Sequence, residues 1–501
     1  MNETTSDLLV VGGGINGAGI ARDAAGRGLS VTLVERDDLA SHTSSMSTKL
    51  IHGGLRYLEY REFRLVSEAL VEREVLLKLA PHLIEPLAFV LPHEPHLRPA
   101  WMIRCGLFLY DHLGGRMSLP KSFGVKLAGS RWGAGLQPHL TRGFVYSDAR
   151  VDDARLVVAN AMSARTLGAT IRPRTLLVSA RRDGPVWRAE IESGGVRSQL
   201  RARAIVNAAG PWVTDVQRRL DDEPAGAGVR HVKGSHIVVP RVHPEEHAYI
   251  LQNADNRIVF VIPYQEKYSL IGTTDVTVQD YEDPCISDDE VDYLLTLVNG
   301  YLATPLARSD IVWTYSGVRP LYDDGASDPA AVTRDYVLKL DAGHEPLEAP
   351  LLSIFGGKIT TYRKLAEAAL AELAPFFPTM KPAWTRTAPL PGGDIAGGDR
   401  AQLFARLCAR YPHLPFELLR AFGRRHGTRA FDVLGDASVL ADLGIGFGAH
   451  LTAREVDWMV GEEWAVSADD ILWRRTKCGL PMNAAERDAV RAYLDDRPAS
   501  T

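Results

Sequence analysis

Three glycines and one glutamate near the start of the chain have the types and the spacing needed to hold a dinucleotide. Gly12, Gly14 and Gly17 form the pattern G-x-G-x-x-G. The first glycine permits a tight turn, the second lets a diphosphate approach the backbone, and the third allows close packing. Glu35 follows and could accept hydrogen bonds from a ribose diol. Its neighbour Arg36 could instead bind a 2′-phosphate, but the charge of Glu35 opposes this.

The residues around this pattern predict the elements that such a site needs. Residues 8–11 are apolar and predict a buried parallel strand, residues 15–27 predict a helix, and residues 29–34 predict a second strand. The helix would begin at Ile15 and Asn16, so that its free N–H groups and its dipole face the anion. Because strand, turn, helix and terminal acid occur in this order, we predict a bound dinucleotide.

The position of the pattern and the loop that follows favour FAD over NAD. The pattern begins within about a dozen residues of the start, as in flavoproteins of the glutathione-reductase type, whereas in NAD enzymes it lies anywhere in the chain. Residues 42–49 are rich in Ser and Thr, whose hydroxyls suit a pyrophosphate and a ribitol chain; a polar surface loop is the alternative. The cofactor contacts predicted here are Ser44, Ser45, Ser47, Lys49 and Leu50.

Two later segments are predicted to belong to the same nucleotide domain. Residues 203–210 read as a strand that ends in small residues, which let a backbone pass close to a ligand. Residues 351–355 read as another strand, and a glycine pair then feeds a helix, which makes a second anion site. If this site faces a flavin ring, it stabilises negative charge on the reduced ring. The predicted contacts are Ala209, Gly210, Gly356, Gly357, Lys358 and Thr360.

Eight short strings spread over the chain carry a family resemblance. They are VGGGINGAG at 11–19, KLIHGGLRYL at 49–58, FRLV at 63–66, PHEPHLR at 92–98, KGSH at 233–236, GTTD at 272–275, WTYSGVRP at 313–320 and GGK at 356–358. Together they closely resemble the FAD-dependent glycerol-3-phosphate dehydrogenases, in particular the bacterial aerobic, respiratory type. The similarity runs from about residue 7 to the end and includes a C-terminal helical region.

The resemblance implies a flavoprotein that oxidises sn-glycerol 3-phosphate to dihydroxyacetone phosphate. A hydride would pass to FAD, and the electrons would then pass to ubiquinone or menaquinone. The resemblance also implies contact with membrane lipid, with the protein attached peripherally to the inner face of the cell membrane. An oxidase that uses oxygen is the nearest alternative. An NAD-dependent dehydrogenase and a non-catalytic FAD-binding platform are more distant alternatives, and a homodimer is left open.

Two histidines are candidates for the base that removes the hydroxyl proton of an alcohol. His52 precedes Gly53 and Gly54, and this glycine pair could let the chain lie against the flavin with His52 beside the ring. An imidazole titrates near neutral pH, which suits a general base. His236, which follows a Gly-Ser turn, is the second candidate, and a structural role is the alternative for either.

Basic residues in loops or at element ends could hold the substrate phosphate. A guanidinium binds phosphate through two hydrogen bonds, so Arg319 is the first candidate and is counted with His52 and His236 as catalytic. Gly317 and Pro320 on either side of Arg319 predict a fixed turn. Thr273, Thr274 and Asp275 are equally compatible with a substrate role and with a strand-end turn capped by Asp275. The other predicted substrate contacts are Arg56, Tyr57, His236, Arg334 and Lys358.

Two regions could meet a membrane surface. Residues 96–110 mix aromatic and apolar side chains with arginines, and Arg116 and Lys121 follow; this suits a helix that lies on acidic lipids, while a buried core helix is the alternative. For the second region a solvated charged face is slightly preferred. Its basic residues are Arg424, Arg425, Arg429, Arg474, Arg475 and Lys477.

The composition narrows the class of protein. The chain has 501 residues, of which 46% are apolar and 24% charged, which is typical of a globular protein and not of a disordered one. A formal charge of −5 argues against a nucleic-acid binder. Four cysteines without CxxC spacing predict no metal site and fit a reducing compartment. An acidic start and the absence of an 18-residue apolar run predict a cytoplasmic protein without a spanning helix.

We predict an α/β fold in which a discontinuous, Rossmann-like FAD-binding domain of the glutathione-reductase type carries a β-rich substrate domain and a C-terminal helical domain. Apolar strands at 237–239, 258–262 and 269–271 predict the substrate domain. The predicted boundaries are 1–90, 146–227 and 346–388 for the FAD-binding domain, 91–145 for an insertion that could face the membrane, 228–345 for the substrate domain and 389–501 for the helical domain.

Overall fold

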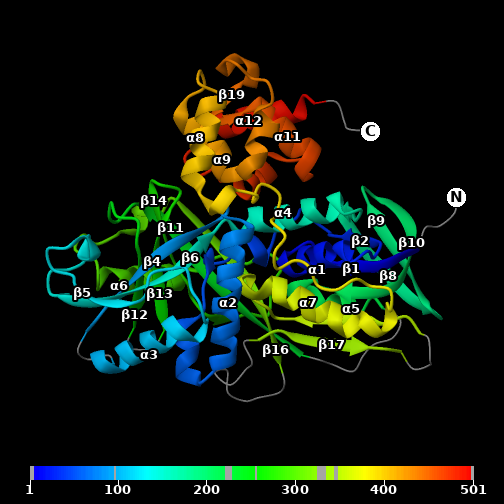
Figure 1. The fold of residues 1–501 in the computed structure, drawn as a ribbon, viewed down its shortest axis with the longest axis horizontal. Helices are drawn as coiled ribbons and strands as arrows, with labels where there is room; N and C mark the ends of the chain where they lie inside the picture. Colours follow the sequence, from blue (N-terminus) through cyan, green and yellow to red (C-terminus); the bar gives the residue numbers. More distant parts are fainter. Residues whose placement is uncertain are drawn as a thin grey trace.

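Two β-sheets and a C-terminal group of helices make up the fold (Figure 1). The helical group lies above the line where the two sheets meet, with the first sheet to the right and the second to the left in this view. The computed structural model describes residues 5–94, 98–220, 228–253, 257–323, 335–343 and 348–497.

The first sheet has the parallel core of a dinucleotide-binding fold. Its order is β17-β18-β10-β1-β2-β7, in which only the edge strand β17 is antiparallel to its neighbour, and the β8–β9 hairpin pairs with the first half of β10. The strands are β1 (Thr5–Val11), β2 (Val31–Val34), β7 (Thr170–Arg172), β8 (Thr175–Asp183), β9 (Val186–Ser193), β10 (Val196–Asn207), β17 (Val337–Asp341) and β18 (Leu351–Phe355).

Both faces of this sheet are buried, which explains the continuous apolar run in β1. Leu8 and Val10 pack under three helices, whereas Leu9 and Val11 pack on the other side against Trp187 and its neighbours. The three covering helices are α1 (Ile15–Gly26), α4 (Asp153–Thr166) and α7 (Tyr362–Leu373). The predicted strand, helix and strand at the start of the chain are therefore confirmed.

The second sheet is larger and mainly antiparallel. Its order is β15-β11-β14-β13-β12-β4-β6-β3, with β16 paired along β11 and β5 paired along β6. Helix α6 (Asp288–Asn299) packs on one face, and α2 (Phe63–Leu79) and α3 (Ala100–Leu113) pack on the other. The strands are β3 (Leu50–Ile51), β4 (Ile84–Pro92), β5 (Phe123–Lys126), β6 (Arg142–Val151), β11 (Gly228–Pro240), β12 (Ala248–Gln252), β13 (Ile258–Tyr264), β14 (Tyr268–Gly272), β15 (Val276–Thr277) and β16 (Trp313–Asp323).

The sheets divide the chain differently from the predicted boundaries at residues 90 and 146. Strands β3, β4 and β6 all pair within the second sheet, whereas the predicted boundaries place them largely in the nucleotide domain. The long antiparallel pairing of β4 with β6 joins segments far apart in sequence, so no local pattern marks it.

Residues 317–320 do not form the predicted turn. Arg319 lies inside β16, where Val232 is its partner in β11, and Pro320 stands opposite His231. Among the described strands β16 pairs only with β11, so it is an edge strand, and a proline at an edge needs no N–H on the open side.

Helix α3 exposes an apolar surface to solvent, so the interpretation of this region as a buried core helix is wrong. Trp101 is 66% exposed and Phe108 56% exposed, whereas Leu107 and Tyr110 face the core. Within the described ranges, no helix has both the length and the apolar character that crossing a bilayer requires.

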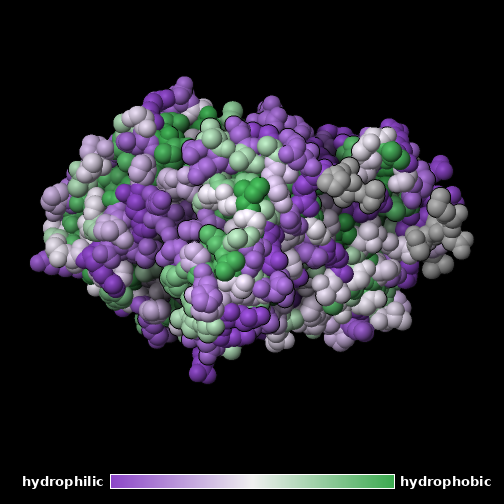
Figure 2. Space-filling model, turned by 90° about the horizontal axis from the view of Figure 1, so that it is seen from above, coloured by the Kyte–Doolittle hydropathy of each residue, from purple (hydrophilic) through white to green (hydrophobic). Residues whose placement is uncertain are grey.

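The C-terminal helices carry two small cores of their own. Seen from above, over these helices, the molecule is mainly hydrophilic with small separate hydrophobic spots (Figure 2). The elements of the helical group are α8 (Arg400–Arg410), α9 (Phe416–His426), α10 (Ala430–Leu434), α11 (Ala453–Glu463), α12 (Ala484–Asp495), β19 (Gly446–Gly448) and β20 (Leu451–Thr452). The short helix α5 (Val213–Gln217) belongs to the first domain.

Part of the C-terminal basic region is buried, contrary to both interpretations of it. Arg475 is fully buried and its Nη2 donates to Asp38 Oδ1 at 2.9 Å, and Arg474 Nε lies 2.6 Å from Asp38 Oδ2. Lys477 Nζ lies 3.1 Å from Asp152. Because Asp38 belongs to the loop after β2, the helical domain is anchored to the loop that follows Glu35.

Candidate functional site

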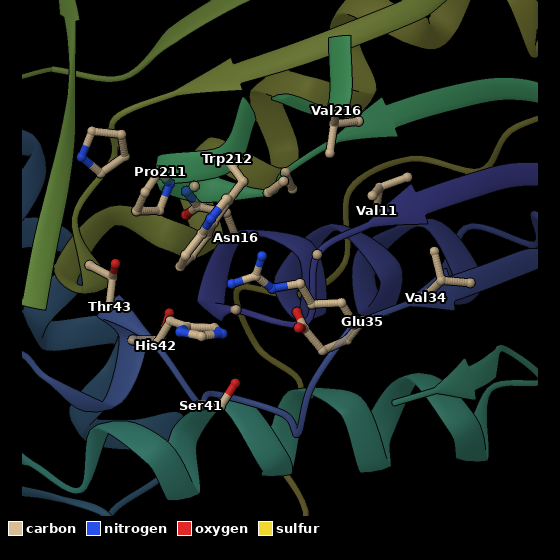
Figure 3. A pocket seen from close by; sticks show the side chains of 18 of the residues that line it. Val11, Asn16, Val34, Glu35, Ser41, His42, Thr43, Pro211, Trp212 and Val216 are labelled. Atoms are coloured by element: carbon tan, nitrogen blue, oxygen red, sulfur yellow. The ribbon is translucent and has the colours of Figure 1, made fainter. Parts of the chain in front are cut away.

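A cleft opens at the carboxyl ends of β1, β2 and β10, the edge where open α/β sheets bind ligands (Figure 3). It holds about 1010 Å³ of empty space, its open mouth included. Val11, Val34 and Val216 lie toward one end, and Thr43 and Pro211 lie toward the other. The predicted residues that line the cleft are Gly12, Gly14, Ile15, Asn16, Glu35, Arg36, Ser44, Ala209, Gly210, Gly356 and Gly357.

The glycine turn at the cleft requires each of its three glycines for a separate reason. Gly12 has a φ of +112°, and a Cβ there would lie 2.5 Å from the Ala208 carbonyl oxygen. A Cβ on Gly17 would lie 1.9 Å from the Gly12 oxygen, so Gly17 supports the turn from behind. Gly14 has an ordinary backbone, but a Cβ would reach 3.0 Å from Ser44 Oγ and would occupy the cleft side of the turn.

The start of α1 is tied to the loops on either side of the cleft. Ser44 Oγ accepts a hydrogen bond from Ile15 N at 3.0 Å, and Asn16 Nδ2 donates to the Gly356 carbonyl at 3.2 Å. Asn16 Oδ1 is buried and has no hydrogen-bond partner among the described residues. The helix terminus therefore offers the cleft its dipole and an unused acceptor.

Glu35 is buried at the end of β2 and organises the turn. Its Oε2 accepts from Gly13 N at 2.6 Å and its Oε1 accepts from Asp37 N at 2.9 Å. Burial raises the pKa of Glu35, and these two backbone N–H groups oppose that shift. A carboxylate has lone pairs for further bonds, so Glu35 can still accept a ribose diol.

The mouth of the cleft has an aromatic wall that sequence reasoning did not assign. The guanidinium of Arg36 lies 4.2 Å from the Trp212 ring centroid, and the His42 ring lies 4.5 Å from Trp212. Arg36 also pairs with Asp37 and Glu282, each at 2.9 Å, so its charge is balanced without a 2′-phosphate. The signal for Trp212 was an aromatic residue directly after a strand that ends in small residues.

Lys358 follows the glycine pair that lines the cleft, and its side chain contacts Tyr57, which belongs to a second group of predicted residues. The backbone of 356–357 lines the cleft, and the Lys358 ammonium lies 3.8 Å from the Tyr57 ring centroid. Its Nζ is buried, and no hydrogen-bond acceptor among the described residues reaches it. A buried ammonium without an acceptor is costly, which points to an anionic ligand at this place.

His52 lies beside this ammonium. Its backbone N–H donates to Thr360 Oγ1 at 3.2 Å, which ties β3 to the turn after β18. Burial lowers the pKa of His52, Lys358 lowers it further, and Asp148 opposes both. The imidazole is therefore neutral at pH 7, as a general base must be. Arg56 follows His52 closely in the sequence and is half-buried. Its Nη2 lies 3.5 Å from the Tyr60 hydroxyl.

His236 and Arg319 share one face of the second sheet. In the β11–β16 register His236 pairs with Tyr315 and Val232 pairs with Arg319, and residues two apart along a strand share a face. The Tyr315 ring stacks on His236 at 4.7 Å, and its hydroxyl donates to the Ser47 carbonyl at 2.8 Å. This face therefore looks toward the loop at 43–49.

Both residues already have protein partners. His236 Nε2 lies 3.0 Å from Thr48 Oγ1, its Nδ1 is buried without a partner among the described residues, and burial lowers its pKa to about 3. Arg319 is half-exposed, forms an ion pair with Asp275 and donates to the Thr274 carbonyl at 3.3 Å. Asp275 thus has a role other than capping a turn.

Other predicted contacts fasten the loop at 43–49 onto the protein. Lys49 Nζ lies 2.9 Å from Asp153 Oδ2 and 2.8 Å from the Ser45 carbonyl, and Ser47 Oγ donates to the same carboxylate at 2.8 Å. Leu50 packs in the apolar core beneath α2 and α3. A direct cofactor contact stays a prediction for these four residues, and Arg334 lies outside the described residues.

Comparison with known proteins identifies the family. The model of the family described as FAD dependent oxidoreductase matches residues 7–361, and the C-terminal domain of alpha-glycerophosphate oxidase matches residues 383–495. The chain belongs to the FAD-dependent oxidoreductases. It is 54% identical to the aerobic glycerol-3-phosphate dehydrogenase of Escherichia coli, over 98% of this chain and 97% of that protein. The family recognised in the eight strings is thereby confirmed.

Two further relatives of this FAD-dependent oxidoreductase are named for different substrates. The glycerol-3-phosphate dehydrogenase of Pseudomonas aeruginosa is 55% identical over 97% of this chain and 94% of its own length. The D-erythritol 1-phosphate dehydrogenase of Brucella abortus is 52% identical over 98% of each chain. The crystal structure of the Bacillus halodurans glycerol-3-phosphate dehydrogenase with FAD has the same fold, with a TM-score of 0.74 and 24% identity over 99% of this chain and 95% of that one.

The cleft of this FAD-dependent oxidoreductase fits its cofactor. The glycine turn would hold the diphosphate against the start of α1, and Glu35 would hold the adenosine ribose. Asn16 Oδ1 and the Lys358 ammonium have no hydrogen-bond partner among the described residues, so FAD or the substrate could bond to them.

Gly14→Val is expected to abolish FAD retention. The branched side chain would press on Ser44 Oγ and take the space that the diphosphate needs, so bound flavin should fall to about a tenth of wild type or less. Flavin absorbance per chain after gel filtration measures this. Gly461→Ala is the matched control, because a Cβ there meets no atom within 4 Å. A fully flavinylated Gly14→Val protein would refute the role of the turn.

Proposed function

We propose that this flavoprotein oxidises sn-glycerol 3-phosphate to dihydroxyacetone phosphate and passes the electrons to a membrane quinone. The observation that carries the proposal is the buried ammonium of Lys358, which has no hydrogen-bond acceptor among the described residues and acts electrostatically on His52. Lys358 directly follows Gly356 and Gly357, which line the dinucleotide cleft. Oxidation of an alcohol phosphate needs a base for the hydroxyl and a positive charge for the phosphate. His52 and Lys358 offer these two groups. The names of the relatives at 54% and 55% identity support the choice of substrate.

In the proposed reaction His52 takes the proton of the secondary hydroxyl while the carbon loses a hydride. Bound FAD supplies the hydride acceptor. Lys358 and Arg319 hold the substrate phosphate and so fix the carbon and its hydroxyl relative to the base. His236 is the alternative base. Its low pKa also leaves it neutral, but a weaker base removes a hydroxyl proton less readily.

A related polyol phosphate is the second candidate substrate. The relative named D-erythritol 1-phosphate dehydrogenase is 52% identical to this chain, close to the 54% of the Escherichia coli glycerol-3-phosphate dehydrogenase. Both substrates present a secondary alcohol and a phosphate, which the same base and cations serve. Comparing kcat/KM for the two substrates decides between them.

Anaerobic titration tests cofactor, substrate and acceptor together. The yellow protein should bleach on addition of glycerol 3-phosphate without air. Mixing the bleached protein with a soluble ubiquinone analogue should restore the colour faster than mixing with air-saturated buffer. Faster recovery with oxygen would mean an oxidase, and protein that stays yellow with either polyol phosphate would overturn the proposed reaction.

We further propose that α3 rests on the inner face of the cell membrane. Its exposed Trp101, Met102 and Phe108, with Arg104 and Arg116 in the same region, suit the boundary between headgroups and acyl chains. In Figure 1 α3 lies at the opposite end of the molecule from the C-terminal helices. Sedimentation with acidic vesicles should be lost in a Trp101→Ser, Phe108→Ser protein and kept in wild type.

Arg319→Ala is expected to raise the KM for glycerol 3-phosphate at least about tenfold, a loss of about 1.4 kcal/mol of binding, with a smaller change in kcat. The half-exposed position of Arg319 limits the effect. Asp275→Asn is the matched variant, because it releases Arg319 from its ion pair and should leave KM unchanged or lower. Steady-state kinetics at fixed quinone measures both, and an unchanged KM in Arg319→Ala would remove this arginine from the site.

A further inference from the structure

A chain of buried hydrogen bonds supports the turn that follows His52. The backbone N–H of Gly53 donates to the Tyr110 hydroxyl at 2.8 Å, and this hydroxyl donates to Asp148 Oδ2 at 2.7 Å. Asp148 Oδ1 accepts from Arg73 Nη1, also at 2.7 Å. Tyr110, Asp148 and Arg73 are each at most 2% exposed. The chain thus runs from the His52–Gly53 segment to a buried ion pair.

Three different elements contribute these groups. Tyr110 comes from α3, Asp148 from β6 and Arg73 from α2. Arg73 is itself fixed, since it also donates to the Ser147 carbonyl at 2.8 Å and pairs with Glu74 at 3.0 Å. A side chain with this many partners cannot change rotamer without breaking several bonds. The Tyr110 hydroxyl is therefore presented to Gly53 from a rigid support.

The turn fits this support closely. A Cβ on Gly53 would lie 2.5 Å from Leu70 Cδ2 and 2.7 Å from the Tyr110 hydroxyl, and Gly54 has a φ of +75°. Only a glycine at 53 lets the backbone N–H reach Tyr110. The hydrogen bond therefore holds the peptide that directly follows His52, and a shift of this peptide would turn the imidazole.

The second link between this chain and His52 is electrostatic. Among the described groups, the two charges that act on the imidazole are Asp148 of β6 and Lys358 after β18, and they have opposite signs. Asp148 raises the pKa of His52, which burial and Lys358 lower. Burial also keeps Tyr110 protonated by raising its pKa well above the ordinary value, so that it stays a donor to Asp148.

We propose that Asp148 and Tyr110 are positioning residues for the reaction. Tyr110 holds the Gly53–Gly54 turn and with it the orientation of His52, and Asp148 fixes Tyr110 and places a negative charge behind the imidazole. Both residues would act through Gly53 and His52 and not by contact with the substrate. This assignment rests on His52 as the base of the proposed function, and it gives a role to two buried polar groups that the sequence motifs do not include.

Two conservative variants separate the two roles. Tyr110→Phe removes one hydroxyl and keeps the ring, so anaerobic flavin reduction by glycerol 3-phosphate should slow about tenfold with KM little changed, because a misoriented base acts only in the transition state. The pH at which reduction falls off on the acid side should not move, since the Asp148 charge remains. Tyr146→Phe is the matched control: this ring packs against Tyr110 at 5.8 Å but lies outside the chain, and reduction should keep its wild-type rate.

Asp148→Asn keeps the shape and removes the charge. The acid limb of the rate–pH profile should then move to lower pH by about one unit, and the plateau rate should fall by up to about tenfold, because His52 becomes a weaker base. Flavin content and melting temperature show whether the variant is folded. If it is not, Tyr110→Phe decides alone.

The outcomes separate this inference from the proposed function. Wild-type reduction by glycerol 3-phosphate, together with wild-type rates and an unmoved acid limb in both folded variants, would overturn the positioning roles and leave the proposed reaction standing. Protein that substrate does not reduce at all would overturn both. We expect Tyr110→Phe to reduce its flavin more slowly with an unchanged rate–pH profile. We expect the acid limb of that profile to move to lower pH in Asp148→Asn.

Discussion

Lys358→Met is expected to lower kcat/KM for glycerol 3-phosphate by about a hundredfold, which corresponds to about 2.7 kcal/mol of lost transition-state stabilisation. Methionine keeps the length and the apolar stem but removes the charge. The ammonium is buried, it lies over the Tyr57 ring, and no acceptor among the described residues reaches its Nζ. In the free enzyme this ammonium therefore lacks a hydrogen-bond acceptor among the described residues, and an anionic ligand would supply one.

The division of the effect between KM and kcat tells which anion Lys358 serves. A rise in KM alone means that the ammonium binds the substrate phosphate in ground and transition states alike. A fall in kcat with a lowered flavin reduction potential means that it stabilises negative charge on the reduced ring. Lys364→Met is the matched control, because Lys364 is half-exposed on α7 and pairs with Glu367 at 3.3 Å. Wild-type kinetics in Lys358→Met would exclude Lys358 from the site.

The dinucleotide turn could be predicted because its determinants are local. The apolar run of β1, the glycine spacing and the acid at the end of β2 all lie within one strand–helix–strand unit. The positive φ of Gly12 and the close approach behind Gly17 are consequences of that unit's geometry. Little of the rest of the chain is needed to form this part of the site.

Features that depend on distant pairing could not be predicted in the same way. Arg319 lies in a strand, since β16 pairs with β11, although a glycine and a proline on either side are typical of a turn. Arg475 is buried against Asp38, which lies 437 positions earlier in the sequence, so no local pattern indicates this contact. In isolation a pair of adjacent arginines reads as a solvated surface, and only the tertiary contact reveals an anchor between domains.

The support behind His52 shows the same limit. Tyr110 belongs to a helix that composition suggested as either buried or membrane-facing, and in the structure one face of α3 is exposed while Tyr110 and Leu107 point inward. Asp148 lies in β6, most of whose residues are buried, and no neighbouring motif marks this acid as functional. Their significance arises only when α2, α3 and β6 bring them together.

His52→Gln is expected to slow anaerobic flavin reduction by about a hundredfold or more, because glutamine fills the site but cannot take a proton. His236→Gln is the matched comparison: it removes an imidazole that already bonds to Thr48 and should cost far less. Stopped-flow absorbance at saturating substrate measures both. If only His236→Gln slows reduction, the base is His236 instead.

The pH dependence provides a separate check on His52. Burial and Lys358 place its pKa below the ordinary 6.5, so reduction should be flat near pH 7 and fall only as the pH drops through that lowered pKa and the imidazole gains its proton. Lys358→Met removes the described charge that opposes protonation of His52, so the acid limb should move to higher pH in that protein. A limb that stays in place when Lys358 loses its charge would mean that the titrating base lies elsewhere.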